Sequence, residues 1–411
     1  MKPASLIPHL FRNEFSRMVA VLVKYMGLHN LEAAEDIVSE SFLAAMETWP
    51  YKGVPPNPVA WLYTVAKNKA KNRHQRQTVF DTKVVPQLLQ QADKATEMPP
   101  IDLSEKSIND SQLQMLFAVC NPLLSQESQI GLALRVLCGF GLDEIANALL
   151  SNRETIHKRL TRAKEKLREA GITLTVPGKN EIAARLDTVL TTLYLLFNEG
   201  YYSETNDAVI RKELCAEAMR LTYLLVNNPD TGLPKVKALL SLMCFHSSRL
   251  DARETTNGSI ILYDEQDETR WNRELIGKGV FYMHEAASGN QLSSYHLEAC
   301  IAYWHTVKNN TKEKWQNILN LYNLLLKLEY SPIAALNRSY ALYMTGETAT
   351  AIVEAEKLQL IHNHYYHCLL GELYSKTDKP TAALHFEKAL QLAKTRTDKE
   401  IIRKKLSKFS D

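Results

Sequence analysis

The sequence predicts an all-α protein, and three observations support this prediction. Apolar residues recur at steps of three and four along most of the chain, which is the period of an amphipathic helix. Only 15 glycines and 15 prolines occur in 411 residues, too few for a turn-rich β protein. The chain also lacks G-x-G-x-x-G and G-x-x-x-x-G-K-[ST], the glycine loops typical of nucleotide-binding α/β folds.

The composition is that of a folded protein, with 45% apolar and 23% charged residues. No apolar stretch approaches the roughly 20 residues that a membrane span needs, and Met1–Phe15 lacks the apolar core of a signal peptide. The six cysteines are scattered without a C-x-x-C pair, which favours buried free thiols over a disulfide framework or a zinc site. We therefore expect a cytoplasmic protein without a membrane partner, a metal or a cofactor.

Two amphipathic helices are expected near the N-terminus, over residues 6–26 and 33–46. The proline-rich segment Trp49–Pro58 is predicted to be a loop. Pro58 cannot extend a helix backwards, but its fixed φ suits the start of the next helix near Val59.

That next helix becomes strongly basic in its second half, with five basic residues and no acid between Lys67 and Arg76. Its basic groups cannot all share one face, so they form a positively charged rod end suited to phosphates. Nearby aromatic rings are candidates for stacking on unpaired bases, and the two asparagines are candidates for hydrogen bonds to bases or phosphates. A solvated helix with core aromatics is the alternative. The residues concerned are Trp49, Tyr51, Trp61 and Tyr63; Lys67, Lys69, Lys71, Arg73 and Arg76; and Asn68 and Asn72.

Gln87–Asp110 is rich in polar residues and proline and is interpreted as a linker, after which a helical segment runs from Gln112 to Glu169. Residues 142–168 within it predict a helix-turn-helix. Ser151 and Glu154 match a capping box that starts the second helix. The apolar back of that helix (Ile156, Leu160, Ala163 and Leu167) and its basic front are what a helix in a DNA major groove needs. A helical hairpin with a basic exterior is the alternative.

The two basic helices, in this order and spacing, resemble the bacterial sigma-70 family of initiation factors, especially the extracytoplasmic-function type with only regions 2 and 4. Ala34–Phe42 resembles the region 2.2 helix that docks on the β′ clamp helices of RNA polymerase. Trp61–Arg76 resembles regions 2.3–2.4, which open and hold the −10 element, and the Trp49–Pro58 loop lies where the family captures a flipped base. Gln129–Arg168 resembles region 4, with Arg153–Lys164 as the reader of the −35 element.

This resemblance implies core RNA polymerase (its β′ clamp helices and β flap) and promoter DNA as partners, and no catalytic residues, because the polymerase supplies catalysis. The implied polymerase contacts are Asp36, Ser39, Glu40 and Phe42. The implied −10 contacts are Trp49, Tyr51, Trp61, Lys67, Asn68, Lys69, Lys71, Asn72, Arg73 and Arg76. The implied −35 contacts are Arg153, Glu154, Thr155, His157, Lys158, Arg159 and Arg162.

The rest of the chain resembles a subgroup with a long helical C-terminal extension. The segments of this chain that resemble that extension are Leu193–Tyr201, Arg249–Arg253 and Trp271–Leu275. Small residues between 332 and 392, among them Gly346, Ala351, Gly371 and Ala382, predict tetratricopeptide-like helix pairs, with unrelated helical hairpins as the alternative. We expect this extension to regulate the protein in cis, through packing of Leu193–Tyr201 on region 4. Stacked helix pairs also form a concave surface that suits a peptide or protein ligand.

The expected domains are region 2 (1–78), a linker (79–110), region 4 (111–176) and the extension (181–411). The expected function is promoter-directed transcription initiation. A stand-alone helix-turn-helix regulator is the alternative, but it would not need the acidic and apolar helix Asp36–Phe42. A hydrolytic enzyme centred on Glu199 would need clustered catalytic groups, which the sequence does not show.

Overall fold

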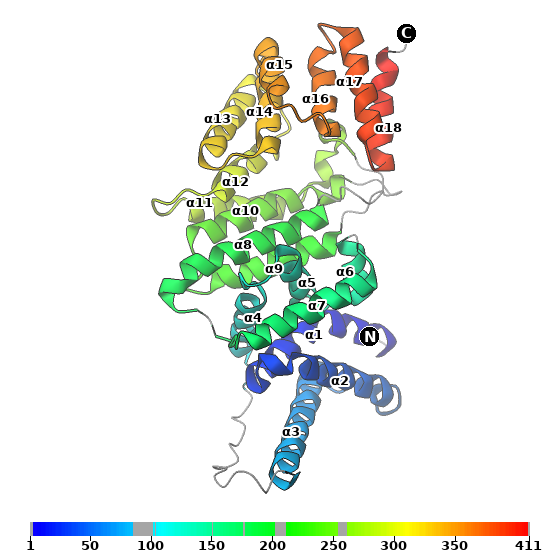
Figure 1. Cartoon of the computed structure of the whole chain (residues 1–411), viewed down its shortest axis with the longest axis vertical. Coiled ribbons are helices and arrows are strands. Elements are labelled where there is room, and N and C mark those ends of the chain that lie inside the picture. Colours follow the sequence, from blue (N-terminus) through cyan, green and yellow to red (C-terminus); the bar gives the residue numbers. More distant parts are fainter. Residues whose placement is uncertain are drawn as a thin grey trace. The chain divides into compact units, whose positions relative to one another are not determined.

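The computed structural model describes residues 3–84, 102, 104–149, 151–175, 177–201, 211–253 and 261–409. These residues contain 18 α-helices and no strand, which confirms the predicted all-α fold (Figure 1). The chain divides into two compact units, Met1–Thr192 and Leu193–Asp411. None of the described helices combines the length and the apolar character that crossing a membrane requires.

The first unit packs α1 against both α2 and α4, and most of its apolar core lies on these three helices. The short 3-10 helix η1 (Leu28–Asn30) joins α1 to α2, and a π-helical turn, η2 (Ala133–Leu137), continues α5. The α-helices are α1 (Pro3–Met26), α2 (Leu31–Lys52), α3 (Pro58–Val84), α4 (Glu105–Val119), α5 (Gln126–Leu132), α6 (Leu142–Ala148), α7 (Arg153–Glu169) and the first part of α8 (Lys179–Tyr201).

Helix α2 is longer than the sequence predicted, because Trp49, Pro50 and Tyr51 continue it where a loop was expected. Pro50 removes only one backbone donor in the last turns. The Trp49 ring is buried, 5.4 Å from the ring of Trp61, and this burial outweighs one lost hydrogen bond. The helix ends at Gly53, whose φ of 82° favours glycine and whose N–H bonds to the Trp49 carbonyl at 3.1 Å.

Helix α3 begins at Pro58, as predicted, and the Asn57 side chain accepts a hydrogen bond from the Ala60 N–H at 3.0 Å. Helices enter the expected linker 79–110 at both ends, since α3 reaches Val84 and α4 begins at Glu105. Residues 85–101 and 103 of that linker lie outside the described part of the chain.

The predicted helix-turn-helix is formed by α6 and α7. All four predicted core residues of α7, Ile156, Leu160, Ala163 and Leu167, are buried. The predicted capping box is wrong by one residue, because Asn152 rather than Ser151 caps the helix. Its side chain accepts the Thr155 N–H at 2.7 Å from an extended backbone, which is the preferred N-cap geometry.

The second unit is a succession of helices in which each contacts the next. After the end of α8 it contains α9 (Lys212–Asn227), α10 (Pro234–Ser247), α11 (Arg273–Ala286), α12 (Ser294–Trp304), α13 (Lys312–Leu328), α14 (Pro332–Met344), α15 (Thr348–Glu356), α16 (His364–Tyr374), α17 (Lys379–Leu392) and α18 (Arg396–Leu406). Short 3-10 helices are η3 (Leu250–Ala252), η4 (Tyr263–Glu265), η5 (Glu268–Arg270) and η6 (Ser407–Phe409).

Small residues let the last helices approach closely, as the sequence predicted. Ala351 and Ala382 are fully buried, and a Cβ on Gly371 would lie 2.9 Å from the Phe386 ring. Gly346 has a different role, because its φ of 98° places it in the turn between α14 and α15. The tetratricopeptide-like character of these pairs stays a prediction.

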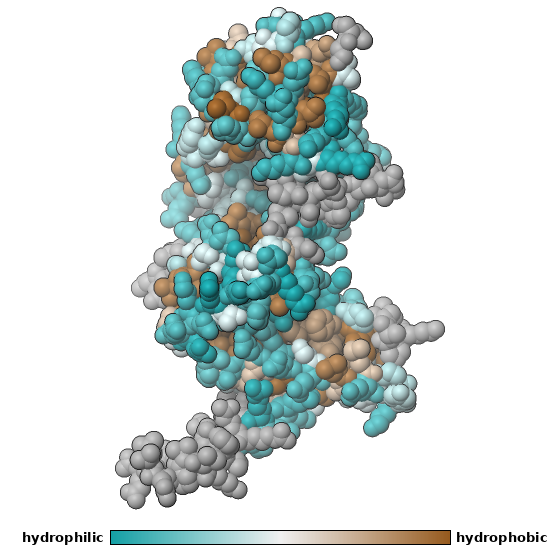
Figure 2. Space-filling model, turned by 45° about the vertical axis from the view of Figure 1, so that its right-hand side comes forward, coloured by the Kyte–Doolittle hydropathy of each residue, from teal (hydrophilic) through white to brown (hydrophobic). Residues whose placement is uncertain are grey.

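All six cysteines are free thiols; four are buried, while Cys300 and Cys368 are partly buried. Burial raises the pKa of Cys120, Cys215 and Cys244 to about 12. The outer surface is mixed, and the face in Figure 2 shows hydrophilic residues interrupted by hydrophobic patches.

Candidate nucleic-acid interface

Helix α7 presents a polar front opposite its buried apolar face. Of the residues predicted to contact −35 DNA, all are exposed except Arg159, which is half-buried. Two of the cations form exposed ion pairs, Arg153 with Asp143 at 3.3 Å and Lys158 with Glu154 at 2.7 Å. Exposed pairs of this kind are weak, so these cations can exchange partners at little cost.

Helix α3 buries Leu62, Tyr63, Ala66 and Ala70. Lys69 is half-buried and donates to Glu40 of α2 at 2.7 Å, so a predicted DNA contact is paired here with a predicted polymerase contact. Lys67 is half-buried, and the side chain of Arg76 lies outside the described residues. The exposed predicted contacts on this helix are Asn68, Lys71, Asn72 and Arg73.

The aromatic residues proposed for base stacking differ in access. Tyr51 is 90% exposed and Trp61 is half-buried. Trp49 and Tyr63 lie in the core, where the Tyr63 hydroxyl donates to Glu14 at 3.3 Å. In this conformation Tyr51 and part of Trp61 can meet a base, whereas Trp49 and Tyr63 support the fold.

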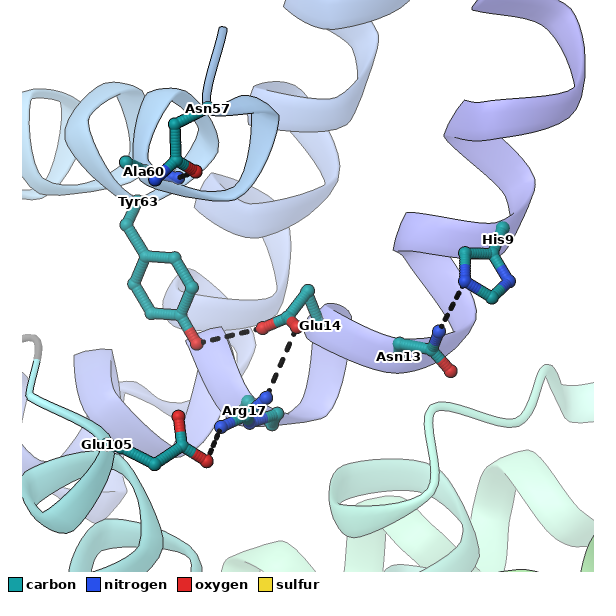
Figure 3. Close-up of polar contacts among 8 residues, drawn as sticks. All are labelled: His9, Asn13, Glu14, Arg17, Asn57, Ala60, Tyr63 and Glu105. Atoms are coloured by element: carbon teal, nitrogen blue, oxygen red, sulfur yellow. Dashed lines mark hydrogen bonds and ion pairs between the residues drawn. The ribbon is translucent and has the colours of Figure 1, made fainter. Parts of the chain in front are cut away.

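Tyr63 belongs to a polar network that joins α1, α3 and α4 (Figure 3). Glu14 accepts hydrogen bonds from Tyr63 and from Arg17, the latter at 3.2 Å. Arg17 also donates to Glu105 at the start of α4, at 2.5 Å. Burial raises the pKa of both Glu14 and Tyr63. The network fixes α4 beside α1 and α3.

The predicted polymerase contacts on α2 fall into two groups. Asp36 and Glu40 are exposed one turn apart and can meet basic groups of a partner. The Ser39 hydroxyl donates to the Glu35 carbonyl of its own helix at 2.8 Å. Phe42 is 3% exposed and packs against Phe11 with ring centres 5.0 Å apart, so it anchors α2 instead of facing a partner.

Glu35 is a site residue that the sequence analysis missed. It is 6% exposed, and its carboxylate binds two cations of the predicted region 4. Arg135 Nε lies 2.9 Å from Oε1, and Lys164 Nζ donates to Oε2 at 2.9 Å. Lys164 also lies 3.8 Å from Glu32. These contacts tie α2 to η2 and α7.

The first part of α8 packs on α4 and α5. Arg185 donates to the Phe117 carbonyl at 2.5 Å, and Thr192 donates to Gln129 at 2.8 Å. Both residues precede Leu193–Tyr201, the segment for which the sequence predicted a contact with region 4.

Among the residues that the structure describes, no three or more His, Cys, Asp or Glu side chains are grouped so as to hold a metal ion. In the histidine-rich segment near α16, His367 instead contacts His385 at 3.0 Å and the Ile361 carbonyl at 3.0 Å.

Comparisons with known proteins give a family for two parts of the chain. Residues 10–79, which include α2 and most of α3, match the family described as Sigma-70 region 2. Residues 185–287 match a family of unknown function, DUF6596. No solved structure matches the chain. The uncharacterized protein R00370 of Rhizobium meliloti (strain 1021) is 32% identical over 392 residues, which cover 94% of this chain and 92% of that protein. The chain therefore belongs to the family of this Rhizobium protein, and its N-terminal part is a region 2 of the sigma-70 type.

Proposed function

We propose that this chain is a sigma factor of the extracytoplasmic-function type that binds core RNA polymerase and directs promoter-specific transcription initiation. The observation that carries the proposal is the match of residues 10–79 to sigma-70 region 2. The basic front of α7, set on a buried apolar back, supports a second DNA contact. A stand-alone helix-turn-helix regulator would leave the region 2 match without a use.

In this proposal α2 is the polymerase-binding helix. Asp36 and Glu40 form an exposed acidic pair, and complementary charge accelerates and orients protein association. Asp36 is the cleaner test position, because Glu40 is already bonded to Lys69. Asp36→Lys should lower co-purification with core polymerase. Glu47→Lys, on the exposed side of the same helix but outside Asp36–Phe42, is the matched control and should bind normally.

The two basic helices are proposed to contact different DNA states. Exposed Lys71 and Arg73 of α3, with Tyr51 nearby in sequence, suit single strands, where backbone charge and base stacking both contribute. The N-terminal half of α7 suits the major groove of duplex DNA. Reconstitution of the full chain with core polymerase, followed by mapping of transcript start sites, tests the proposal. Absence of both co-purification and promoter-dependent starts would overturn it.

The C-terminal helices are proposed to regulate initiation in cis. Supporting this, α8 continues from the unit that carries the DNA-binding helices into the second unit. Its Arg185 and Thr192 contacts hold it against α4 and α5. A chain shortened to end at Thr192 should therefore differ from the full chain in run-off transcription. Equal activity at equal folded concentration and salt would contradict regulation in cis while leaving the sigma-factor proposal intact.

A further inference from the structure

The second unit buries two cations beside one tyrosine ring. Arg249, just after α10, is 7% exposed, and Lys314, in the first turn of α13, is 1% exposed. The guanidinium carbon of Arg249 lies 5.5 Å from the centre of the Tyr263 ring, and Lys314 Nζ lies 5.1 Å from it. Both cations donate to neutral groups: Arg249 to the Tyr201 hydroxyl at 3.4 Å, and Lys314 to the Tyr263 hydroxyl at 3.0 Å and to the Val307 carbonyl.

Neither of these cations forms an ion pair within the described part of the chain, which makes their burial costly. Burial and the charge of Arg249 lower the pKa of Lys314 to about 8. Burial and the same two cations lower the pKa of His305 to about 3. Asp264 and Glu268 act on Lys314 in the opposite direction, but they do not reach ion-pair distance. The cluster therefore holds two buried cations that no carboxylate of the described residues contacts directly.

The same place also has more hydrogen-bond donors than acceptors. Arg249 Nε and the indole N–H groups of Trp271 and Trp315 are buried without a hydrogen-bond partner. Trp271 stacks on Tyr263 with ring centres 6.3 Å apart, and the Trp315 ring lies 5.6 Å from Lys314 Nζ. Buried donors need an acceptor, and an oxyanion supplies several acceptor lone pairs together with the missing negative charge.

We propose that Arg249, Lys314, Trp271 and Trp315, grouped around Tyr263, bind the oxyanion of a small ligand, either a carboxylate or a phosphate. The cluster joins the segments 193–201, 249–253 and 271–275, which the sequence analysis singled out and which the proposed function does not use. Aromatic rings beside two cations suit an organic molecule that carries the oxyanion on an apolar body. This site does not depend on the sigma-factor proposal, since it lies wholly in the second unit.

The test uses the full chain and two probes, inorganic phosphate and acetate, each compared with sodium chloride at equal ionic strength. Hydrogen-exchange mass spectrometry reads protection in residues 261–271 and 305–315, which keeps this site separate from phosphate binding at α3 and α7. At least one probe should slow exchange there, and the probe that does so identifies the oxyanion class. Arg249→Gln and Lys314→Met should each weaken the apparent affinity at least about tenfold.

Arg338→Gln is the matched control, because it removes a partly buried arginine of the second unit that is paired with Glu354 at 2.9 Å. It should leave the protection unchanged. If Arg249→Gln does not fold, Arg249→Lys and Trp271→Phe test the site instead. Arg249→Lys keeps the positive charge and Trp271→Phe keeps an aromatic ring, but each removes a hydrogen-bond donor and should weaken binding. Protection by neither anion in the wild-type chain, or equal protection in all cluster variants, would overturn the proposal.

Discussion

Glu35→Gln tests whether the contact between α2 and α7 restrains the protein. Lys69 and Lys164 bind two carboxylates of α2, Glu40 and Glu35, that are five residues apart. A rise of about 7.5 Å along the helix, plus its width, keeps the two lysine nitrogens within about 20 Å of each other. The −10 and −35 elements are about 25 base pairs apart, or about 85 Å at 3.4 Å per pair. Under the proposed assignment of α3 to the −10 element and α7 to the −35 element, the first unit as it stands is too small to contact both, and we expect α7 to leave α2 on a promoter.

The cost of that separation can be worked from the geometry. Glu35 is nearly buried, while the side chains of Lys164 and Arg135 keep 18% and 28% of their exposure. Removal of such a shared carboxylate costs about 1–3 kcal/mol, below the range for fully buried pairs. We call the form with α7 bound to α2 closed and the form with α7 released open. Loss of the Glu35 carboxylate should then shift the equilibrium about 5- to 150-fold towards the open form.

The assay pairs hydrogen exchange of α7 with run-off transcription at limiting amounts of the protein. Glu35→Gln should speed exchange in α7 and raise run-off yield. Glu32→Gln is the control, because Glu32 is exposed and lies 3.8 Å from the same Lys164, so it should change both readouts little. Co-purification with core polymerase should be unchanged in both variants. If Glu35→Gln behaves like Glu32→Gln in both assays, the restraint does not exist.

Three further predictions concern DNA reading, pH and packing. Replacing Lys158 and Arg162 with Ala should weaken binding to duplex −35 DNA by about 1–3 kcal/mol per lost base contact but spare a pre-melted −10 template; equal losses on both would refute the assignment. Burial raises the pKa of Glu298 to about 7 from 4.5, so the folded chain binds an extra proton between these values and stability falls as pH rises through them. Glu298→Gln should therefore raise the denaturation midpoint at pH 8 and hardly change it at pH 5, which urea titrations at both pH values will show. Gly371→Ala should destabilise the C-terminal helices by about 1–3 kcal/mol, measured by thermal unfolding, because its Cβ would meet the Phe386 ring; an unchanged midpoint would mean that the ring moves freely.

The sequence predicted what depends on local periodicity and chain stereochemistry. The apolar back of α7 and the start of α3 at Pro58 follow from steps of three and four and from the fixed φ of proline. The end of α2 did not, because the burial of Trp49 against Trp61 is a tertiary effect that overrides the local signal of Pro50.

The candidate site was predictable in its residue types but not in its access. Phe42 and Tyr63 lie in segments that match or flank functional motifs, yet their rings complete the core. The ion pairs of Glu35 could not be predicted from the sequence, because its partners Arg135 and Lys164 lie 100 and 129 positions further along the chain. The charges in the sequence do not determine which acidic side chain pairs with which basic one, because that depends on how the helices pack.

The thiols of this chain make it convenient for site-specific labelling. A thiol with a pKa near 12, as at Cys120, Cys215 and Cys244, is ionised at pH 7 to only about one part in 10⁵, and the thiolate is the form that attacks a maleimide. A cysteine introduced at exposed Tyr51 should react far faster than these three. Dyes can then be attached without first removing these three buried cysteines, and with a second introduced cysteine on exposed Arg162 of α7 the separation of α2 from α7 becomes measurable by energy transfer as polymerase and promoter are added.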